Sequence, residues 1–367
     1  MRVAVIGTRG MPGVPGGIER HVEELYPRLA RLGVDVTVYA RRPYIPRSRV
    51  VDGVNIISLP SFGGRNGEAL SHTALSLIHA SRRDFDLVHM HAMGPGVLLP
   101  LARLLGLRPS VFTFHSFDYR RSKWGPGARA FLRFCEWVSI RSSDAIIAVS
   151  VAGTEHIEQR YHRSVHHIPN GPGRLRRRVP GEVITRLGLA PGGYVLAVGR
   201  LSPEKCLEDL IISQAEALPH LQLVLVGDTS YTDGYIARLR AIAGPGVIFP
   251  GYLQGEALEE LYSGALVYAI TSEIEGLSLS LLEAMSLGCP IVASDIPGNR
   301  EALGDPPTGL TYPARDCAAL GKALRTLTED ASLRESLTTA AIARVRDVFD
   351  WDAIATATLD VYEHALL

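Results

Sequence analysis

Residues 2–7, Arg-Val-Ala-Val-Ile-Gly, decide the fold class, because a short run of apolar and β-branched residues stops abruptly at a glycine. A nearly continuous apolar run of this length is typical of a strand buried on both faces of a parallel sheet. Runs of the same kind recur at 35–39, 87–91, 110–115 and 145–150. Segments with helical spacing lie between them, at 17–32 and 128–143. This alternation predicts a parallel sheet with right-handed crossovers.

The same alternation starts again in the second half of the chain, with predicted strands at 194–198, 222–226, 247–249, 266–270 and 290–293. We therefore expect two doubly wound, Rossmann-like α/β domains. Ligands of such sheets bind beyond the carboxyl ends of the strands, so two of them facing each other would form a cleft.

A stretch rich in Pro, Gly and Arg lies between the two series, as is typical of a connection. We predict an N-terminal domain over 1–172, a linker over 173–185 and a C-terminal domain over 186–350. The helical segment 351–367 follows both series. Its periodicity does not decide which domain it packs on. We expect it to pack back on the N-terminal domain.

The composition excludes several classes of protein. With 367 residues, 46% hydrophobic and 21% charged, the chain is a core-forming one and is not disordered, collagenous or a coiled coil. Its zero net charge is the sum of unlike halves. Residues 1–180 hold 26 Lys and Arg against 13 Asp and Glu, and residues 181–367 hold 12 against 25. No nucleic-acid-reading motif accompanies the basic half, so we expect no nucleic-acid partner, while an anionic partner stays open.

Cysteine usage and the chain start favour a cytoplasmic protein. The four cysteines are scattered and show neither metal-ligand spacing nor a disulfide framework. The apolar run at 3–7 is too short for a signal peptide, and no apolar stretch of about 18 residues is present to span a membrane. We expect reduced thiols, no metal ion and no cofactor.

Three glycine-containing loops follow predicted strands. The first, 7–17, ends in Gly16-Gly17 before a helix and can expose N–H groups to an anion, although it matches neither the dinucleotide fingerprint nor a Walker A loop. A flexible connection is the alternative. The second, 199–205, carries Arg200 and Lys205, a pair suited to a diphosphate or, alternatively, to ordinary surface ion pairs.

The third loop carries the strongest signal. Glu275 and Glu283 are separated by seven residues, with a turn at Gly276 and the start of an apolar helix between them. Such a turn exposes N–H groups at a helix N-terminus, and each carboxylate can accept hydrogen bonds from a hydroxyl-rich ligand. A capped surface helix would explain Glu275 but not the apolar surroundings of Glu283.

Together these motifs resemble family 4 of the retaining glycosyltransferases, which have the GT-B fold. The resemblance rests on EGLSLSLLEAMSLGCPIVAS at 275–294, GRLSPEK at 199–205, the glycine pair before the first helix and VFTFHSFD at 111–118. The stretch 115–125 also resembles the HGxDxxRxKW motif of a bacterial subgroup that is associated with cell-surface polysaccharide synthesis.

The resemblance implies a role for each matched residue. Arg200 and Lys205 would hold the diphosphate of a nucleoside diphosphate sugar, Glu283 the ribose, and Glu275 the sugar hydroxyls. The N–H groups of Gly276, Leu277 and Ser278 would complete the sugar pocket. Gly16 and Gly17 would lie against the phosphates, and His115 would contact the transferred sugar. The C-terminal domain would thus bind the donor and the N-terminal domain the acceptor, with Asp118 and His91 as candidates on the acceptor side.

Three positions depart from the family pattern. Cys206 stands where Gly or Asn commonly follows the lysine, Ser116 replaces a glycine, and Ser280 stands where many members have proline. These changes affect packing rather than charge. A GT-B phosphorylase, a UDP-sugar epimerase and a non-catalytic sugar-binding subunit remain as alternatives.

Residues 119–137 combine basic and aromatic side chains, the pattern of a helix lying on an anionic bilayer. The basic members are Arg120, Arg121, Lys123, Arg129 and Arg133, and the aromatic ones are Trp124, Phe131, Phe134 and Trp137. Spacing of three also fits core packing, which is the alternative. We expect a cytoplasmic transferase at the inner face of the membrane, with a lipid-linked or otherwise anionic hydroxyl acceptor.

Overall fold

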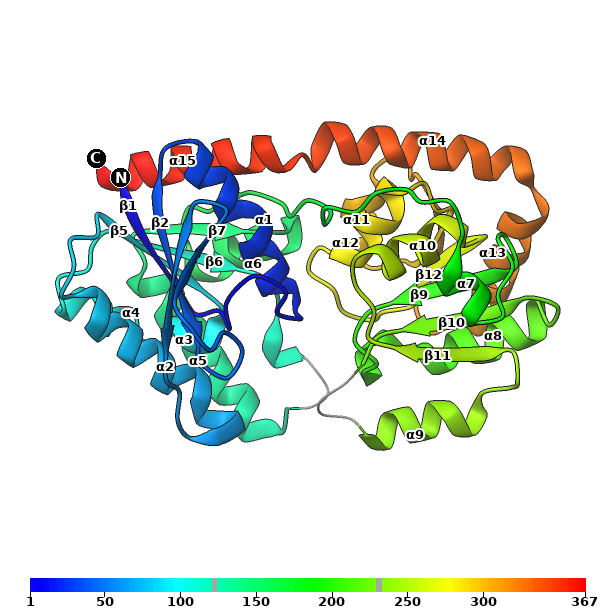
Figure 1. Ribbon diagram of the computed structural model, residues 1–367, viewed down its shortest axis with the longest axis horizontal. Coiled ribbons are helices and arrows are strands. Elements are labelled where there is room, and N and C mark those ends of the chain that lie inside the picture. The colour runs from blue at the N-terminus through cyan, green and yellow to red at the C-terminus, as the bar shows by residue number, and fades with distance from the viewer. Residues whose placement is uncertain (121–123, 229–232) are drawn as a thin grey trace. The chain divides into compact units, whose positions relative to one another are not determined.

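The computed structural model describes residues 1–120, 124–228 and 233–367 and divides the chain into two compact units (Figure 1). The first unit comprises Met1–Gly171 together with Asp350–Leu367, and the second comprises Pro172–Phe349. Each unit is a parallel sheet between helices, so the predicted pair of α/β domains is confirmed.

The first unit has an eight-stranded sheet in the order β3-β4-β2-β1-β5-β6-β7-β8. All neighbours are parallel except β3 and β4. The strands are β1 (Arg2–Ile6), β2 (Asp35–Arg41), β3 (Arg49–Val51), β4 (Val54–Leu59), β5 (Leu87–His91), β6 (Ser110–Phe114), β7 (Ala145–Ala148) and β8 (His166–His167). Arg49 starts the short edge strand β3 and pairs with Ile56 in an antiparallel register.

The helices of this unit are α1 (Gly17–Arg31), α2 (Gly64–Ala80), α3 (Met93–Gly96), α4 (Leu99–Leu104), the 3-10 turn η1 (Asp118–Arg120), α5 (Pro126–Ser142), α6 (Val151–Tyr161) and α15 (Trp351–Leu366). Alternate residues of β1 enter separate cores, with Val3 and Val5 on one face of the sheet and Ala4 and Ile6 on the other. Burial on both faces explains the continuous apolar runs.

The second unit has a six-stranded, all-parallel sheet in the order β11-β10-β9-β12-β13-β14. The strands are β9 (Tyr194–Val198), β10 (Gln222–Val226), β11 (Val247–Gly251), β12 (Val267–Ile270), β13 (Ile291–Ser294) and β14 (Leu310–Tyr312). The helices are α7 (Glu182–Arg186), the 3-10 turn η2 (Pro203–Lys205), α8 (Leu207–Ala217), α9 (Asp233–Ile242), α10 (Glu256–Gly264), α11 (Leu279–Ser286), α12 (Pro297–Leu303), α13 (Cys317–Glu329) and α14 (Ala331–Val348).

The segment 173–185, expected as a linker, is held against the second unit. The Arg178 guanidinium pairs with Glu259, and its Nη2 lies 2.6 Å from the Glu256 carboxylate. The N–H of Val183 donates to Glu260 at 2.8 Å. These three acids lie on α10, so its charged face anchors the arginine-rich connection.

The C-terminal helix α15 packs in the first unit. Its apolar residues Trp351, Ile354 and Tyr362 share a core with Val3 and Val5 of β1. Asp350 caps the helix by accepting from the N–H of Ala353 at 2.8 Å. Among the residues that the structure describes, no helix is long and apolar enough to cross a bilayer.

Candidate functional site

In the second unit, the loop after β9 is bound to the loop after β12. The ammonium group of Lys205 pairs with the carboxylate of Glu275, which also accepts from the Ser272 hydroxyl at 2.6 Å. The hydroxyl of Thr271 donates to the carbonyl of Lys205 at 2.6 Å. Two residues that the sequence assigns to different parts of a ligand, Lys205 and Glu275, are therefore in direct contact.

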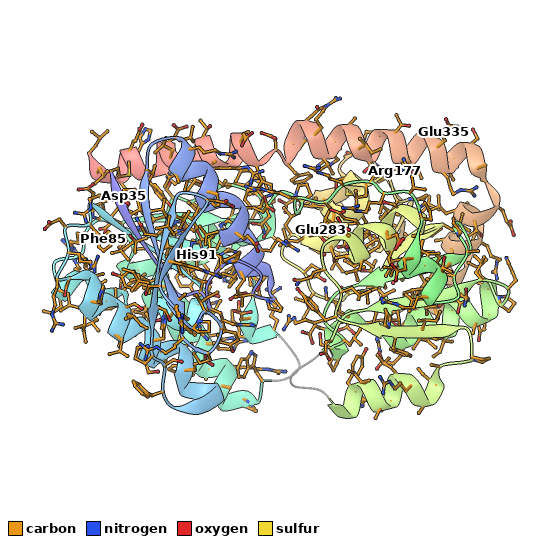
Figure 2. The ribbon with its side chains drawn as sticks, viewed as in Figure 1. Asp35, Phe85, His91, Arg177, Glu283 and Glu335 are labelled. Atoms are coloured by element: carbon orange, nitrogen blue, oxygen red, sulfur yellow. The ribbon has the colours of Figure 1, made fainter. Side chains whose placement is uncertain are left out.

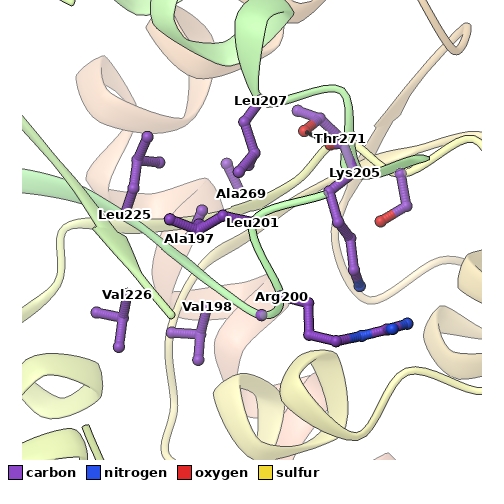
Figure 3. Close-up of a pocket in the computed structure, with 12 residues that line it drawn as sticks. Ala197, Val198, Arg200, Leu201, Lys205, Leu207, Leu225, Val226, Ala269 and Thr271 are labelled. Atoms are coloured by element: carbon purple, nitrogen blue, oxygen red, sulfur yellow. Dashed lines mark hydrogen bonds between the residues drawn. The ribbon is translucent and has the colours of Figure 1, made fainter. Parts of the chain in front are cut away.

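Arg200, on the same loop, lines a pocket at the carboxyl ends of β9 and β12 (Figure 3). Gly199, Lys205 and Thr271 line this pocket as well. Its guanidinium lies 3.8 Å from the Glu204 carboxylate. Figure 3 shows that Arg200 and Lys205 extend to the same side of the loop. Their cationic ends suit a phosphorylated ligand at this sheet edge.

The turn that precedes α11 contains Gly276, Leu277 and Ser278. At the N-terminus of a helix, the first N–H groups have no partner within the helix and are available to a ligand. The carbonyl of Gly276 would lie 1.9 Å from a Cβ placed on Gly298, so the close approach of α12 requires a glycine there.

Glu283 lies one turn into α11 and is 5% exposed (Figure 2). Its carboxylate accepts from the fully buried hydroxyl of Tyr262 at 3.2 Å. The hydroxyl of Tyr268, on β12, donates to Ser280 at 2.9 Å and thereby fixes the first turn of α11. The second carboxylate of the motif is thus held by the core rather than by Lys205.

In the first unit, the glycine pair stands at the start of α1. Gly16 has a φ of 144°, and a Cβ there would lie 2.0 Å from the carboxylate of Glu19. That carboxylate accepts from the N–H of Arg9 at 3.2 Å and is 3.6 Å from its Nε. Around Gly17 the space for a Cβ is open. Gly16 is therefore required by the tight turn, and Glu19 lies close to the helix start where an anion was expected.

His115 follows β6 and is half-buried. Its Nε2 lies 2.9 Å from Nδ1 of His91. His91 is the last residue of β5 (Figure 2). His21, in the first turn of α1, stands edge-on to both rings. His21 Nδ1 donates to the Asn170 side-chain oxygen at 2.7 Å, and its Nε2 has no hydrogen-bond partner among the described residues. The structure thus brings together His115 and His91, two predicted site residues, with His21, which the sequence did not single out.

Burial makes these histidines neutral at pH 7. It lowers the pKa of His21 to about 4 and the pKa values of His91 and His115 well below 6.5. Sequence spacing predicts no metal site, whereas one ring nitrogen from each of the three lies within 4.8 Å of the other two. Neutral imidazoles are suitable ligands for divalent transition metals, but His91 and His115 are already hydrogen-bonded to each other.

Asp118 starts the turn η1 and accepts from the hydroxyl of Ser116 at 3.2 Å. This contact lies within the loop that follows His115. Two predicted basic residues, Arg121 and Lys123, lie outside the described residues. Of the predicted aromatic face, Phe131, Phe134 and Trp137 on α5 are 46%, 52% and 50% exposed, so they are not core residues.

Sequence reasoning missed the residues that support His115. Tyr26 and Asn170 carry no motif, but His21 comes four positions after the glycine pair, and His89 and His91 end the same strand. Histidines that end one strand and start the adjacent helix converge at the same sheet edge, and that signal was present in the sequence.

Two solved structures share the fold of this chain. Sucrose-phosphate synthase from Thermosynechococcus elongatus superposes with a TM-score of 0.87 at 24% identity, covering 99% of this chain and 98% of that one. Anabaena HepE, solved in complex with UDP-glucose, gives a TM-score of 0.82 at 21% identity, covering 99% and 100%. The fold is therefore that of the GT-B class of glycosyltransferases.

Sequence comparisons define the family. The profile described as "Glycosyl transferases group 1" matches residues 190–344, and that described as "Glycosyltransferase Family 4" matches 15–172. Glycogen synthase of Mycobacterium tuberculosis (strain ATCC 25618 / H37Rv) is 30% identical over 405 residues, covering 99% of this chain and 94% of that protein. Alpha-maltose-1-phosphate synthase of Mycolicibacterium smegmatis is 29% identical, covering 99% of each chain. The chain belongs to glycosyltransferase family 4 and is a glycosyltransferase, as the motifs predict.

Proposed function

We propose that this glycosyltransferase moves a sugar from a nucleoside diphosphate sugar to a hydroxyl acceptor, with retention of anomeric configuration. The observation that carries the proposal is the contact between Lys205 and Glu275 beside Arg200, at the carboxyl edge of the second sheet. A cation for phosphate and a carboxylate for sugar hydroxyls then lie side by side. The crystallised complex of HepE with UDP-glucose, in a protein of the same fold, supports this class of donor.

In this proposal each side chain binds the part of the donor that its chemistry suits. Arg200 and Lys205 bind the diphosphate through charge-assisted hydrogen bonds. Glu275 and the N–H groups of Gly276, Leu277 and Ser278 bind the sugar, and Glu283 binds the ribose. The backbone at Gly16 and Gly17 binds phosphate oxygens, and His115 contacts the transferred sugar.

The chemistry follows from the charge that develops on the leaving group. As the bond between the anomeric carbon and the phosphate oxygen breaks, negative charge grows on the diphosphate, where Arg200, Lys205 and the N-terminal N–H groups of α11 stabilise it. The acceptor hydroxyl attacks from the face that the diphosphate leaves, and the departing phosphate oxygen takes its proton. This front-side route retains the anomeric configuration.

The test is a donor and acceptor screen with purified enzyme. Release of a nucleoside diphosphate that depends on an acceptor, with a product of the same anomeric configuration by NMR, is the expected result. Turnover with glucose 1-phosphate alone would instead indicate a phosphorylase, and product formed without an acceptor would indicate an epimerase. Binding without any turnover would indicate a sugar-binding subunit.

We also propose a role in cell-surface polysaccharide or glycolipid synthesis, with a lipid-linked or anionic acceptor reached at an anionic membrane. The exposed face of α5 supports this proposal. It presents Phe131, Phe134 and Trp137 beside Arg129 and Arg133, while Glu136, the single acid of the helix, is 1% exposed. Aromatic side chains with basic neighbours favour a bilayer surface with negative charge.

Flotation with liposomes tests this second proposal. Binding to anionic vesicles that weakens with salt, and that a double replacement F134S/W137S removes, is expected. Replacement of the exposed residue Ile242, on α9 of the other unit, by serine is the control. Equal flotation with neutral vesicles, or none, would contradict it.

A further inference from the structure

A series of buried polar contacts leads from the C-terminal helix to His115. The hydroxyl of Tyr362, on α15, lies 2.6 Å from Nδ1 of His89 on β5. The hydroxyl of Tyr26, on α1, lies 2.9 Å from the same nitrogen and 2.5 Å from Nε2 of His91. His91 Nδ1 then meets His115 Nε2 at 2.9 Å. Tyr26, His89, His91 and Tyr362 are all fully buried.

The direction of these bonds follows from proton counting. A neutral imidazole carries a proton on one nitrogen and a lone pair on the other. Burial lowers the pKa of His91 well below 6.5, so its ring is neutral at pH 7 and can donate through one nitrogen only. The two neighbours of His91 are Tyr26 at Nε2 and His115 at Nδ1. If the ring accepts a hydrogen bond from one of them, it must donate a hydrogen bond to the other.

The distance between Tyr26 and His91 selects one direction. A hydrogen bond that an N–H donates to an oxygen is about 2.7–3.2 Å long, whereas one that an O–H donates to an oxygen is about 2.5–3.0 Å long. At 2.5 Å, the Tyr26 hydroxyl is the donor and Nε2 of His91 the acceptor. His91 therefore carries its proton on Nδ1 and donates it to His115 Nε2, and the 2.9 Å spacing suits an N–H donor. The proton of His115 is then on Nδ1.

We propose that Tyr26 and His91 are positioning residues, which hold His115 in the neutral form protonated on Nδ1 so that it presents a hydrogen-bond donor to the sugar substrate. This inference rests on the proposed contact between His115 and the transferred sugar. On the other side of the Tyr26 hydroxyl, Nδ1 of His89 accepts from the Tyr362 hydroxyl at 2.6 Å, which leaves the proton of Tyr26 to His91. The C-terminal helix thus contributes, through Tyr362, to the contacts that position His115.

Binding of a divalent metal ion is the alternative role for the cluster of His21, His91 and His115. Ligation would use the unpartnered lone pair of His21, but His91 and His115 would have to give up the hydrogen bond that joins them. The chain from Tyr26 supplies a donor to every acceptor along this path, so it accounts for His91 and His115 without an ion.

The test combines spectroscopy with kinetics. In wild-type protein labelled with ¹⁵N-histidine, two-bond ¹H–¹⁵N spectra should show His91 and His115 protonated on Nδ1, with His115 assigned by loss of its signals in H115Q. In Y26F, His91 Nε2 loses its donor, and His115 should become a mixture of both tautomers. We expect kcat to fall at least about tenfold, with the donor KM changed by less than about twofold.

Y39F is the matched control. Tyr39 is also fully buried in the first unit, and its hydroxyl also contacts a histidine, His79, at 3.0 Å, outside this chain. It should leave the His115 spectrum and kcat as in wild type. If Y26F does not fold, Y362F replaces it, because loss of the second phenol frees the Tyr26 hydroxyl to turn toward His89.

The assigned tautomers would be overturned by a wild-type His115 that is protonated on Nε2, or by a His115 spectrum that is the same in the wild type and in whichever variant folds. A shift of the ring nitrogens of all three histidines by equimolar Zn²⁺ would also overturn the proposal. A tautomer change with unchanged kcat would overturn the positioning role in transfer. Failure of the proposed contact between His115 and the sugar shows itself separately, because H115Q would then retain full activity while the spectra could still follow the prediction.

Discussion

Lys205 and Glu275 are 70 positions apart in the chain, and their side chains form an ion pair between the loops after β9 and β12. Both are largely buried, with 16% and 15% of their side chains exposed. An ion pair with little access to water is held more firmly than a surface pair. In this arrangement Glu275 keeps the ammonium group at the sheet edge, where a phosphate would arrive.

Lys205→Ala is expected to weaken nucleoside diphosphate binding at least about tenfold, because a charge-assisted hydrogen bond contributes about 1.5–3 kcal/mol. Titration calorimetry measures this, using whichever of UDP, GDP and dTDP raises the melting temperature of the wild type most. Lys322→Ala, an exposed lysine on α13 in the same unit, is the control and should bind as wild type does. Equal nucleoside diphosphate affinities of the two variants would show that Lys205 does not bind the ligand.

Glu283→Ala should weaken binding of the nucleoside part of the ligand and leave binding of its diphosphate part unchanged. If Glu283 binds ribose hydroxyls, the variant loses about tenfold in affinity for the nucleoside diphosphate, whereas affinity for pyrophosphate alone stays unchanged. Tyr262→Phe removes the hydroxyl that donates to Glu283 and leaves the carboxylate in place, so a smaller loss is expected. If Glu283→Ala weakened the binding of the nucleoside diphosphate and of pyrophosphate equally, a general loss of the fold of α11 would be indicated.

The fold was predictable because strands buried on both faces give continuous apolar runs, and ten such runs were found in the chain order that the sheets confirm. The strands β3, β4, β8 and β14 were missed. Three of them, β3, β8 and β14, are edge strands of two or three residues, which carry no periodicity. The residues of β4 alternate between buried and partly exposed, so they form no continuous apolar run. The segment 173–185 was not recognised as part of the second unit, because its anchoring acids on α10 are remote in sequence.

For the candidate site, sequence motifs brought Lys205 and Glu275 to the same sheet edge but did not predict their direct contact. The support of His115 was beyond motif reasoning, because Tyr26 and Tyr362 come from opposite ends of the chain and are ordinary core residues by pattern. Which buried hydroxyl faces which imidazole is decided by tertiary packing.

Acid should destabilise the first unit well before its carboxylates titrate. The pKa of His21 and that of His72 are both lowered from 6.5 to about 4 by burial. Below pH 6.5 the unfolded chain therefore binds protons that the folded one does not, so the free energy of unfolding falls by about 1.4 kcal/mol per pH unit for each histidine until pH 4. Above pH 6.5 the two contribute no slope.

Tryptophan fluorescence can follow this loss, because Trp124, Trp137 and Trp351 all belong to the first unit. Urea unfolding at pH 7.5, 6.5 and 5.5 should show the change, and H72Q should reduce the slope between the two lower values. Replacement of the exposed His162 should leave it unaltered. A wild-type free energy of unfolding that is constant from pH 6.5 to 5.5 would contradict the prediction.

Trp351 should contribute strongly to the stability of the first unit, because it starts α15 and is 4% exposed. Its ring stands edge-on to His21 with centroids 5.6 Å apart, and the Arg28 guanidinium lies 5.8 Å from its centre. Removing a buried aromatic ring typically costs about 3–5 kcal/mol, so W351A should lower the free energy of unfolding by that amount, as measured by urea with Trp124 and Trp137 as reporters.

The neighbouring residue Asp352 supplies the control. Its carboxylate is 3.0 Å from Nε of Arg28, but 78% of its side chain is exposed, and such pairs contribute less than about 1 kcal/mol. D352A should therefore unfold close to wild type. W351F, which keeps an aromatic ring against His21, should lie between W351A and the wild type. If W351A and D352A cost the same, the ion pair rather than the buried ring would hold α15 in the first unit.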